Sequence, residues 1–342
     1  MSKFVLIGDL HFGEKGNSEK FNNHILDFLG WACSLKASHG VEKVVQGGDW
    51  FHSRHKIDVM SLNYGIAGAK ILQETYGRDN TYVICGNHDT YNLDSLTINT
   101  VETLTPYVTT VYEPVMVDNL LMTPWITSGE MWDSLVKNKW KAEYLIGHFE
   151  FNGFMVNDAY MMEHGLSHKE LKKFKKVFSG HYHTPQKKDN VVYLGTPYPI
   201  TMSEANQEHG VYIFDSVTGD VEFIVYDGIK VLSIPYTDID KYSDLNPETT
   251  NIRIEFPDDL EDETLISECV DKLSKLKFTD VKVKYTPKKL KDLIDLDVEI
   301  EEIENIDKAV IEFIKSSTVV QGIDKELLGK FYQIAVESRT DD

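Results

Sequence analysis

Paired cysteines are missing from this chain of 342 residues. Its three cysteines, Cys33, Cys85 and Cys269, show no paired spacing. This excludes a disulfide framework or a zinc–thiolate site as the organising feature, and it is typical of a reducing cytoplasm. Any metal bound here should therefore be held by histidine, aspartate and asparagine side chains.

Long hydrophobic runs are also missing. The sequence contains no run of about eighteen apolar residues, which is the length that a membrane-spanning helix needs. The first residues, "MSKFVLIGDLHFG", hold an apolar stretch that is too short and too polar for a signal peptide. We expect a cytoplasmic protein without a membrane partner.

Positive charge is scarce, because 35 basic residues stand against 55 acidic ones, giving a net charge of −20. Residues 1–230 hold 20 basic and 28 acidic residues, and residues 231–342 hold 15 and 27. Since surfaces that bind nucleic acids are normally basic, this balance argues against a chain that binds DNA unaided. Two local basic runs, "KELKKFKK" (169–176) and "KVKYTPKKLK" (282–291), are either solvated faces or the first places to look for DNA contacts.

The first 230 residues alternate short β-branched runs with amphipathic stretches, which predicts a layered α/β domain over 1–230. Two helices are expected at 20–38 and 59–76. The expected strands lie at 3–9, 42–49, 81–89, 142–150, 175–183, 190–197, 209–215 and 221–227.

A second, smaller unit is expected over 231–290. A connector rich in turn residues covers 225–244, and strands at 251–257 and 280–287 then flank a helix at 262–277 in a β-α-β pattern. The remaining residues, 291–342, predict two amphipathic helices at 299–317 and 322–338. Such a pair either docks on a partner protein or packs on its own domain, and the pattern favours neither.

Titratable and amide side chains follow five of the expected strands. Ligands of α/β folds bind beyond the carboxyl ends of strands, so these groups can converge on one pocket. Each group alone is an ordinary turn, but five of them in a chain with 12 histidines indicate a shared site. The groups are Asp9-Leu10-His11, Gly48-Asp49-Trp50-Phe51-His52, Gly86-Asn87-His88-Asp89, Gly147-His148 and Gly180-His181-Tyr182-His183.

This set of side chains suits a centre with two divalent ions. Mn²⁺ and Fe²⁺ accept imidazole, carboxylate and amide ligands, and neither requires a thiolate. Two ions roughly 3.5–4 Å apart need a shared carboxylate, and such a pair can lower the pKa of a water molecule and hold phosphoryl oxygens. An aspartate beside a histidine, as in His88-Asp89, would fix the tautomer of the imidazole.

The order of these motifs resembles the calcineurin-like metallophosphoesterases over about residues 4–215. The resemblance implies two metal ions, and each residue takes the role of its counterpart in the family motif. Asp9, His11 and His183 would bind one ion, Asn87, His148 and His181 the other, and Asp49 would bridge the two. His88 would be a non-ligand imidazole that contacts the phosphate, and Asp89 would orient it.

Within that family, the chain resembles the SbcD-type nucleases of double-strand-break repair. It lacks the Asp-Arg-Gly signature of the protein phosphatases, and His52 stands three residues after the predicted bridge, as a second non-ligand histidine does in these nucleases. Four stretches closely resemble the nuclease subunits of the recombination endonucleases of T-even-like phages: "GHFEFNGF", "EHGL", "VFSGHYHTPQ" and "VYLGTPYPIT".

The resemblance implies a fold, an activity and partners. The fold is an α-β-β-α sandwich with a small α+β capping domain (231–290) that binds DNA and a helical segment (291–342) that binds an SMC-like ATPase of the SbcC type. The activity is Mn²⁺-dependent hydrolysis of DNA, as an exonuclease on duplexes and an endonuclease on single strands, with Mg²⁺ or Fe²⁺ as alternative ions. A homodimer within a heterotetramer is the implied assembly.

Two other functions remain compatible with the sequence. A two-metal phosphodiesterase that acts on small nucleotides would share the same site residues, because the fold does not fix the substrate. A scaffold for the ATPase with weak catalysis is the third possibility, although every expected type of metal ligand is present.

Overall fold

Two six-stranded sheets form the body of the protein. The computed structural model describes residues 2–157, 160–257, 260, 263–276 and 281–284. In the first sheet, four neighbouring strands run parallel, and the two strands at one edge each pair antiparallel with the neighbour on their inner side. Its order is β16 (Val221–Val225), β15 (Gly210–Asp215), β1 (Lys3–Ile7), β2 (Lys43–Gln46), β3 (Thr81–Ile84) and β6 (Thr109–Val111).

The second sheet has four parallel strands in its centre and an antiparallel strand at each edge. Its order is β13 (Gln186–Lys188), β14 (Val191–Tyr193), β12 (Lys176–Gly180), β9 (Tyr144–His148), β8 (Leu120–Met122) and β7 (Val115–Val117). All eight strands that were predicted within 1–230 are confirmed. Two short hairpins, β4 (Thr90–Asn92) with β5 (Ser95–Asn99) and β10 (Met155–Asn157) with β11 (Tyr160–Met161), project from these sheets.

Two long helices confirm the predicted helical segments. They are α2 (Glu19–His39) and α3 (Val59–Tyr76), and they are followed along the chain by α4 (Gly129–Lys137). The short α1 (Glu14–Asn17) precedes α2. Both long helices begin at a capping side chain: Ser18 accepts a hydrogen bond from the N–H of Phe21, and Asp58 accepts one from the N–H of Met60.

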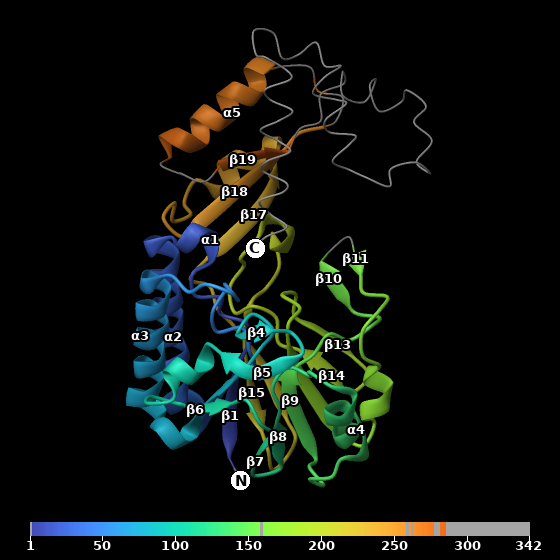
Figure 1. Cartoon of the computed structure of the whole chain (residues 1–342). Coiled ribbons are helices and arrows are strands. Elements are labelled where there is room, and N and C mark those ends of the chain that lie inside the picture. The colour runs from blue at the N-terminus through green and yellow to red at the C-terminus, as the bar shows by residue number, and fades with distance from the viewer. Residues whose placement is uncertain (1, 158–159, 258–259, 261–262, 277–280, 285–342) are drawn as a thin grey trace, which may run out of the picture. The chain divides into compact units, whose positions relative to one another are not determined.

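Alternating side chains of the strands build the layers. In β1, Phe4 and Leu6 lie in the core between the two sheets, whereas Val5 and Ile7 pack toward α2 and α3. The second sheet buries its other face against Trp132 and Leu135 of α4. Figure 1 shows α2 and α3 side by side on the first sheet. The domain is thus the predicted α-β-β-α sandwich.

A third, three-stranded parallel sheet corrects one prediction. The segment 225–244 was expected to be a connector, but it contains the strand β17 (Lys230–Pro235), which pairs with β18 (Thr250–Glu255). β17 is an edge strand that ends on a proline, so its short apolar run is hidden among turn residues. The predicted β-α-β unit follows as β18, α5 (Glu263–Lys275) and β19 (Val281–Lys284).

The predicted helices at 299–317 and 322–338 lie outside the described residues, as do residues 285–290 of the expected capping unit. Among the described helices, none is both long enough and apolar enough to cross a membrane.

Candidate metal centre

The carboxyl ends of five parallel strands bring the predicted site residues together. The motif residues follow β1, β2 and β3 in the first sheet and end or follow β9 and β12 in the second. Because both sheets turn their carboxyl ends toward the same side, groups far apart in sequence lie within 4.8 Å of one another. Three such groups form: Asp9-His11-His183, Asp49-His148-His181 and His11-His52-His88.

The first group combines one carboxylate with two imidazoles. Nε2 of His11 lies 3.2 Å from Nε2 of His183, and the side chains of His11 and Asp9 are buried. Oδ2 of Asp9 accepts the N–H of His181, whereas Oδ1 is buried without a hydrogen-bond partner among the described residues. Two facing ring nitrogens and a spare carboxylate oxygen form a donor set for a cation.

The second group contains an amide oxygen. Oδ1 of Asn87 lies 2.9 Å from Nε2 of His148 and 3.0 Å from Nδ1 of His181. Nδ1 of His148 donates to the carbonyl of Gly47 over 3.0 Å, which directs Nε2 toward the site. Two imidazole nitrogens and one amide oxygen therefore point at the same small volume.

Asp49 lies between the two groups. Its Oδ2 is 3.3 Å from Nε2 of His148 and 3.9 Å from Nε2 of His11, so one carboxylate oxygen reaches an imidazole of each group. Its Oδ1 accepts the N–H of His88 over 2.8 Å. This position suits the carboxylate that a pair of ions would share.

His52 and His88 form the third group with His11. Their rings stack with centroids 5.6 Å apart, and Nδ1 of His88 donates to the carbonyl oxygen of His52 over 2.6 Å. Nε2 of His88 is therefore the nitrogen left to face a substrate. His52 in turn lies 2.5 Å, through Nδ1, from Oε2 of Glu14.

Asp89 was predicted to orient His88, and the structure places the Asp89 carboxylate on backbone N–H groups. The ring is fixed by the carbonyl of His52 instead. The buried Asp89 carboxylate accepts the N–H groups of Trp50, Phe51 and Gly86 over 3.0–3.2 Å. Because these amides belong to the loops after β2 and β3, Asp89 holds the two loops against each other. Any effect of Asp89 on His88 would pass through the backbone.

The backbone of the site is constrained. His11, Asp49 and His181 have φ values of 54°, 55° and 92°, in the left-handed region that non-glycine residues rarely adopt. A Cβ at Gly86 would lie 2.2 Å from Oδ1 of Asp49, and one at Gly180 would lie 2.5 Å from Oδ1 of Asp9. The motif glycines are therefore needed for the close approach of the carboxylates, and the strained residues are those that carry the ligands.

Buried carboxylates without a counter-cation are unfavourable here. Burial raises the pKa of Asp9 and of Asp89, while repulsion from Asp49 adds to both shifts. Burial opposes a charge on His148, yet the carboxylates of Asp49 and Asp9 raise its pKa to about 9. The site thus attracts positive charge, and its imidazole, carboxylate and amide donors fit divalent ions of the Mn²⁺ or Fe²⁺ type.

Sequence patterns did not reveal two carboxylates that contact the predicted ligands. Oε1 of the buried Glu204 lies 3.4 Å from Nδ1 of His183, and Oε2 of the half-exposed Glu150 lies 3.4 Å from Nε2 of His181. Glu204 also accepts the N–H of Ile200 over 2.7 Å, so it is firmly held. Only the nearness of Glu204 to "GTPYPIT" in the sequence hinted at this role.

We expect Glu204→Gln to weaken Mn²⁺ binding about 10–100-fold, because a carboxylate that fixes a ligating histidine is then replaced by a neutral amide. The measurement is calorimetric titration of the metal-free protein with Mn²⁺. Glu208→Gln, an exposed position four residues later, is the control and should bind as the wild type does. Equal affinity of the Glu204 and Glu208 variants would contradict this positioning role.

The basic run 169–176 lies away from this centre. It covers the short helix η3 (His168–Leu171) and the start of β12, whereas His181 and His183 follow the end of that strand. Five strand residues span about 16 Å. Lys172 and Lys173 are exposed, as a solvated face would have them. The second run is described only as far as Lys284.

Aspartate, asparagine and histidine ligands that converge from two stacked sheets, with one carboxylate between two groups, define a metallophosphoesterase site. Exonuclease subunit 1 of Enterobacteria phage T4 is 30% identical to the chain over 232 residues, which make up 65% of this chain and 67% of that protein. The chain belongs to the calcineurin-like metallophosphoesterases and, within them, to the SbcD-type nucleases. It is an enzyme that hydrolyses phosphodiester bonds.

The other comparisons add less. No family model matches the chain. Among solved structures it is similar to Yfce, a phosphoesterase from E. coli, at 11% identity, over 64% of this chain and 96% of that chain, with a TM-score of 0.29. Because that score is low, the family assignment rests on the phage relative and not on this likeness.

Proposed function

We propose that the protein is a Mn²⁺-dependent DNA nuclease, with exonuclease action on duplexes and endonuclease action on single strands. The position of Asp49 between two groups of ligands, with the His88 ring beside them, carries this proposal. The name of the phage relative, an exonuclease subunit, supports the choice of a nucleic acid as substrate.

The predicted ligands fall into two sets, one for each proposed metal ion. Asp9, His11 and His183 would hold one ion, Asn87, His148 and His181 the other, with Asp49 shared. When bound, the ions would stabilise charge on the phosphoryl oxygens and lower the pKa of the hydrolytic water.

His88 would complete the reaction. With Nδ1 committed to the carbonyl of His52, a charged His88 can contact the phosphate and give the proton at Nε2 to the leaving oxygen. His52 buttresses that ring through stacking and its carbonyl, and Glu14 fixes His52 in turn. A second imidazole beside the first is the feature that favours a nuclease over a small-nucleotide phosphodiesterase.

We also propose that the protein works as a subunit, in a homodimer that binds an SMC-like ATPase of the SbcC type. The word "subunit" in the name of the phage relative supports an assembly. The net charge of −20 supports a partner that supplies most contacts to the DNA backbone. Residues 291–342, as the predicted ATPase-binding segment, stay part of this proposal.

A cleavage assay tests the proposal. We expect labelled linear duplex and single-stranded DNA to be cut with Mn²⁺, more slowly or not at all with Mg²⁺, and not in EDTA, since the donor set suits Mn²⁺ better. The ATPase subunit should raise the rate on duplex. If small cyclic nucleotides were cut with Mn²⁺ while both DNA substrates stayed intact, alone and with the ATPase, the substrate proposed here would be wrong.

A further inference from the structure

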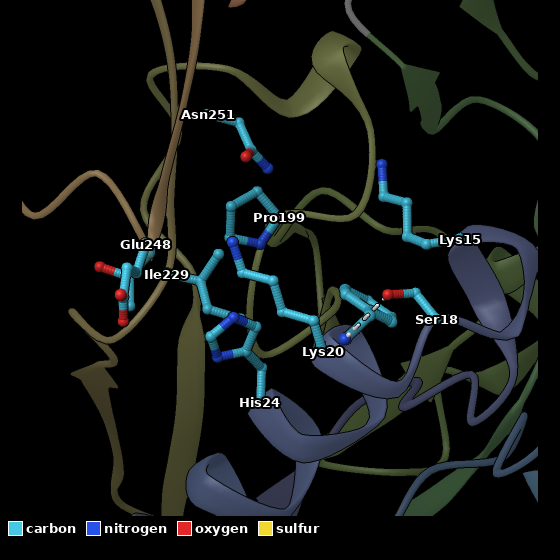
Figure 2. Close-up of a pocket in the computed structure, with 10 residues that line it drawn as sticks. Lys15, Ser18, Lys20, His24, Pro199, Ile229, Glu248 and Asn251 are labelled. Carbon is cyan, nitrogen blue, oxygen red and sulfur yellow. Dashed lines mark hydrogen bonds between the residues drawn. The ribbon is translucent and has the colours of Figure 1, made fainter. Parts of the chain in front are cut away.

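A cavity of about 280 Å³ opens beside the start of α2. Figure 2 shows its lining, which combines an apolar floor with charged walls. The floor is made by the buried side chains of Phe21, Pro199 and Ile229. Lys15 and Lys20 stand at its rim, and among the described residues neither lysine has an ion-pair partner.

Two short stretches of chain connect the lining of this cavity to the metal centre. Lys15 follows Glu14, whose carboxylate contacts His52. On the other side, Pro199 precedes Ile200, whose N–H binds Glu204, and Glu204 contacts His183. Residues next to the cavity lining in the sequence thus contact both the His52 side and the His183 side of the centre.

We propose that this cavity binds one unpaired nucleotide of the substrate strand, next to the phosphodiester that is cut. The inference rests on the proposed nuclease function and names a substrate subsite for it. A base would lie on the flat apolar floor, as bases stack on apolar and aromatic side chains in single-strand sites. Its phosphate would meet the ammonium groups of Lys15 and Lys20.

Two polar side chains can contact the edge of the base. Asn251 offers both a donor and an acceptor, and Glu248 offers an acceptor for an exocyclic amino group. The cavity is at the small end of ligand pockets, which start at roughly 300 Å³, so it has room for one nucleotide and not for a base pair. A duplex must therefore open at its end before its strand can reach this subsite.

Because the chain is strongly acidic, the two lysines at the cavity indicate where an anionic ligand can bind. A protein with a net charge of −20 repels an anionic strand over most of its surface. Two ammonium groups without an ion-pair partner among the described residues, at the rim of an apolar cavity, form a local exception. The chemistry of the cavity thus matches a nucleotide, with one anionic end and one flat apolar part.

Binding without divalent ions isolates this subsite from the metal centre. We expect deoxycytidine 5′-monophosphate and a fluorescent single-stranded oligodeoxycytidylate to bind the full chain in EDTA and to compete with each other. Lys20→Glu should weaken both by at least about tenfold, since it replaces a phosphate-binding cation by an anion. Lys15→Glu is a second variant in case the first does not fold, and thermal unfolding checks both. Lys139→Glu, an exposed lysine after α4, is the matched control and should bind as the wild type does.

Several results would overturn the inference. The inference is wrong if neither probe binds the wild type, or if Lys20→Glu and Lys15→Glu bind both probes as the wild type does. It is also wrong if Lys139→Glu loses as much affinity as these variants, or if the mononucleotide binds without displacing the oligonucleotide. A failure of the nuclease proposal alone would give a different result. In that case the probes still bind in EDTA and compete, but Mn²⁺ brings no cleavage of DNA.

Discussion

His88→Ser should retain both metal sites and lose hydrolysis, with kcat lowered by about 10²–10⁴. The ring is the part of His88 that faces a substrate, whereas its backbone N–H already serves Asp49 and is unaffected by the substitution. Removing the ring therefore removes a proton donor and a phosphate contact without removing a predicted ligand. The measurements are calorimetric Mn²⁺ binding and single-turnover cleavage of labelled DNA.

His55→Ser is the matched control for this variant. His55 is an exposed histidine of the same loop, and its ring contacts Tyr91, so its loss should leave cleavage unchanged. The alternative role for His88 is that of a metal ligand, because its ring also lies within ligand distance of His11 and His52. If His88→Ser lost a bound Mn²⁺ along with its activity, His88 would be a ligand and the role proposed for it would be refuted.

Strands were the easiest part of the fold to predict, because each buried strand of the sandwich is a continuous apolar run. Val44, Val45, Ile146 and Phe178 are buried in strands that are covered on both faces, so apolar residues stand next to each other in the sequence and do not alternate with polar ones. β17 escaped prediction because its sheet covers it less completely. Only Val231 and Ile234 of its six residues are buried, and Pro235 ends it.

The ligands of the centre could be predicted because they follow the strands directly, where chain direction alone brings them together. Their supporting contacts could not. Glu204 meets His183 from 21 positions away in sequence, and Asp89 binds the loop after β2 from 38 or 39 positions away. Such pairings depend on how loops fold back, and local sequence patterns carry no information about that.

The acidity of the chain and its proposed substrate can be reconciled by the arrangement of charges in the site. Six carboxylates lie in or beside the centre: Asp9, Asp49, Asp89, Glu14, Glu150 and Glu204. Without cations they would repel a phosphodiester, so substrate binding should depend on the metal ions as much as on basic side chains. Binding of a phosphodiester at this centre should therefore be far weaker in EDTA than with Mn²⁺.

Asp49→Ala is the substitution with the largest expected effect on metal binding. One oxygen of Asp49 lies within 4 Å of an imidazole from each group, so its loss removes a donor from both ions at once. We expect Mn²⁺ affinity to fall by more than the roughly 10–100-fold seen when an outer partner of a ligand is removed. By mass action, Mn²⁺ at 100 times its Kd should stabilise the wild-type protein by about 2.7 kcal/mol for each bound ion, and most of this gain should be lost in the variant.

Calorimetry and thermal unfolding, each with Mn²⁺ and with EDTA, measure these effects. Asp94→Ala, at an exposed position in the loop between β4 and β5, is the control and should keep the full stabilisation by Mn²⁺. Asp49→Asn separates the charge from the shape, because the amide keeps the acceptor for the N–H of His88 while it lacks the anionic oxygen. We expect it to fold like the wild type in EDTA and still to fail to hold two ions. Two equivalents of Mn²⁺ bound with wild-type affinity by either Asp49 variant would show that this carboxylate does not bridge the ions, and the two-metal arrangement would have to be rebuilt around Asp9.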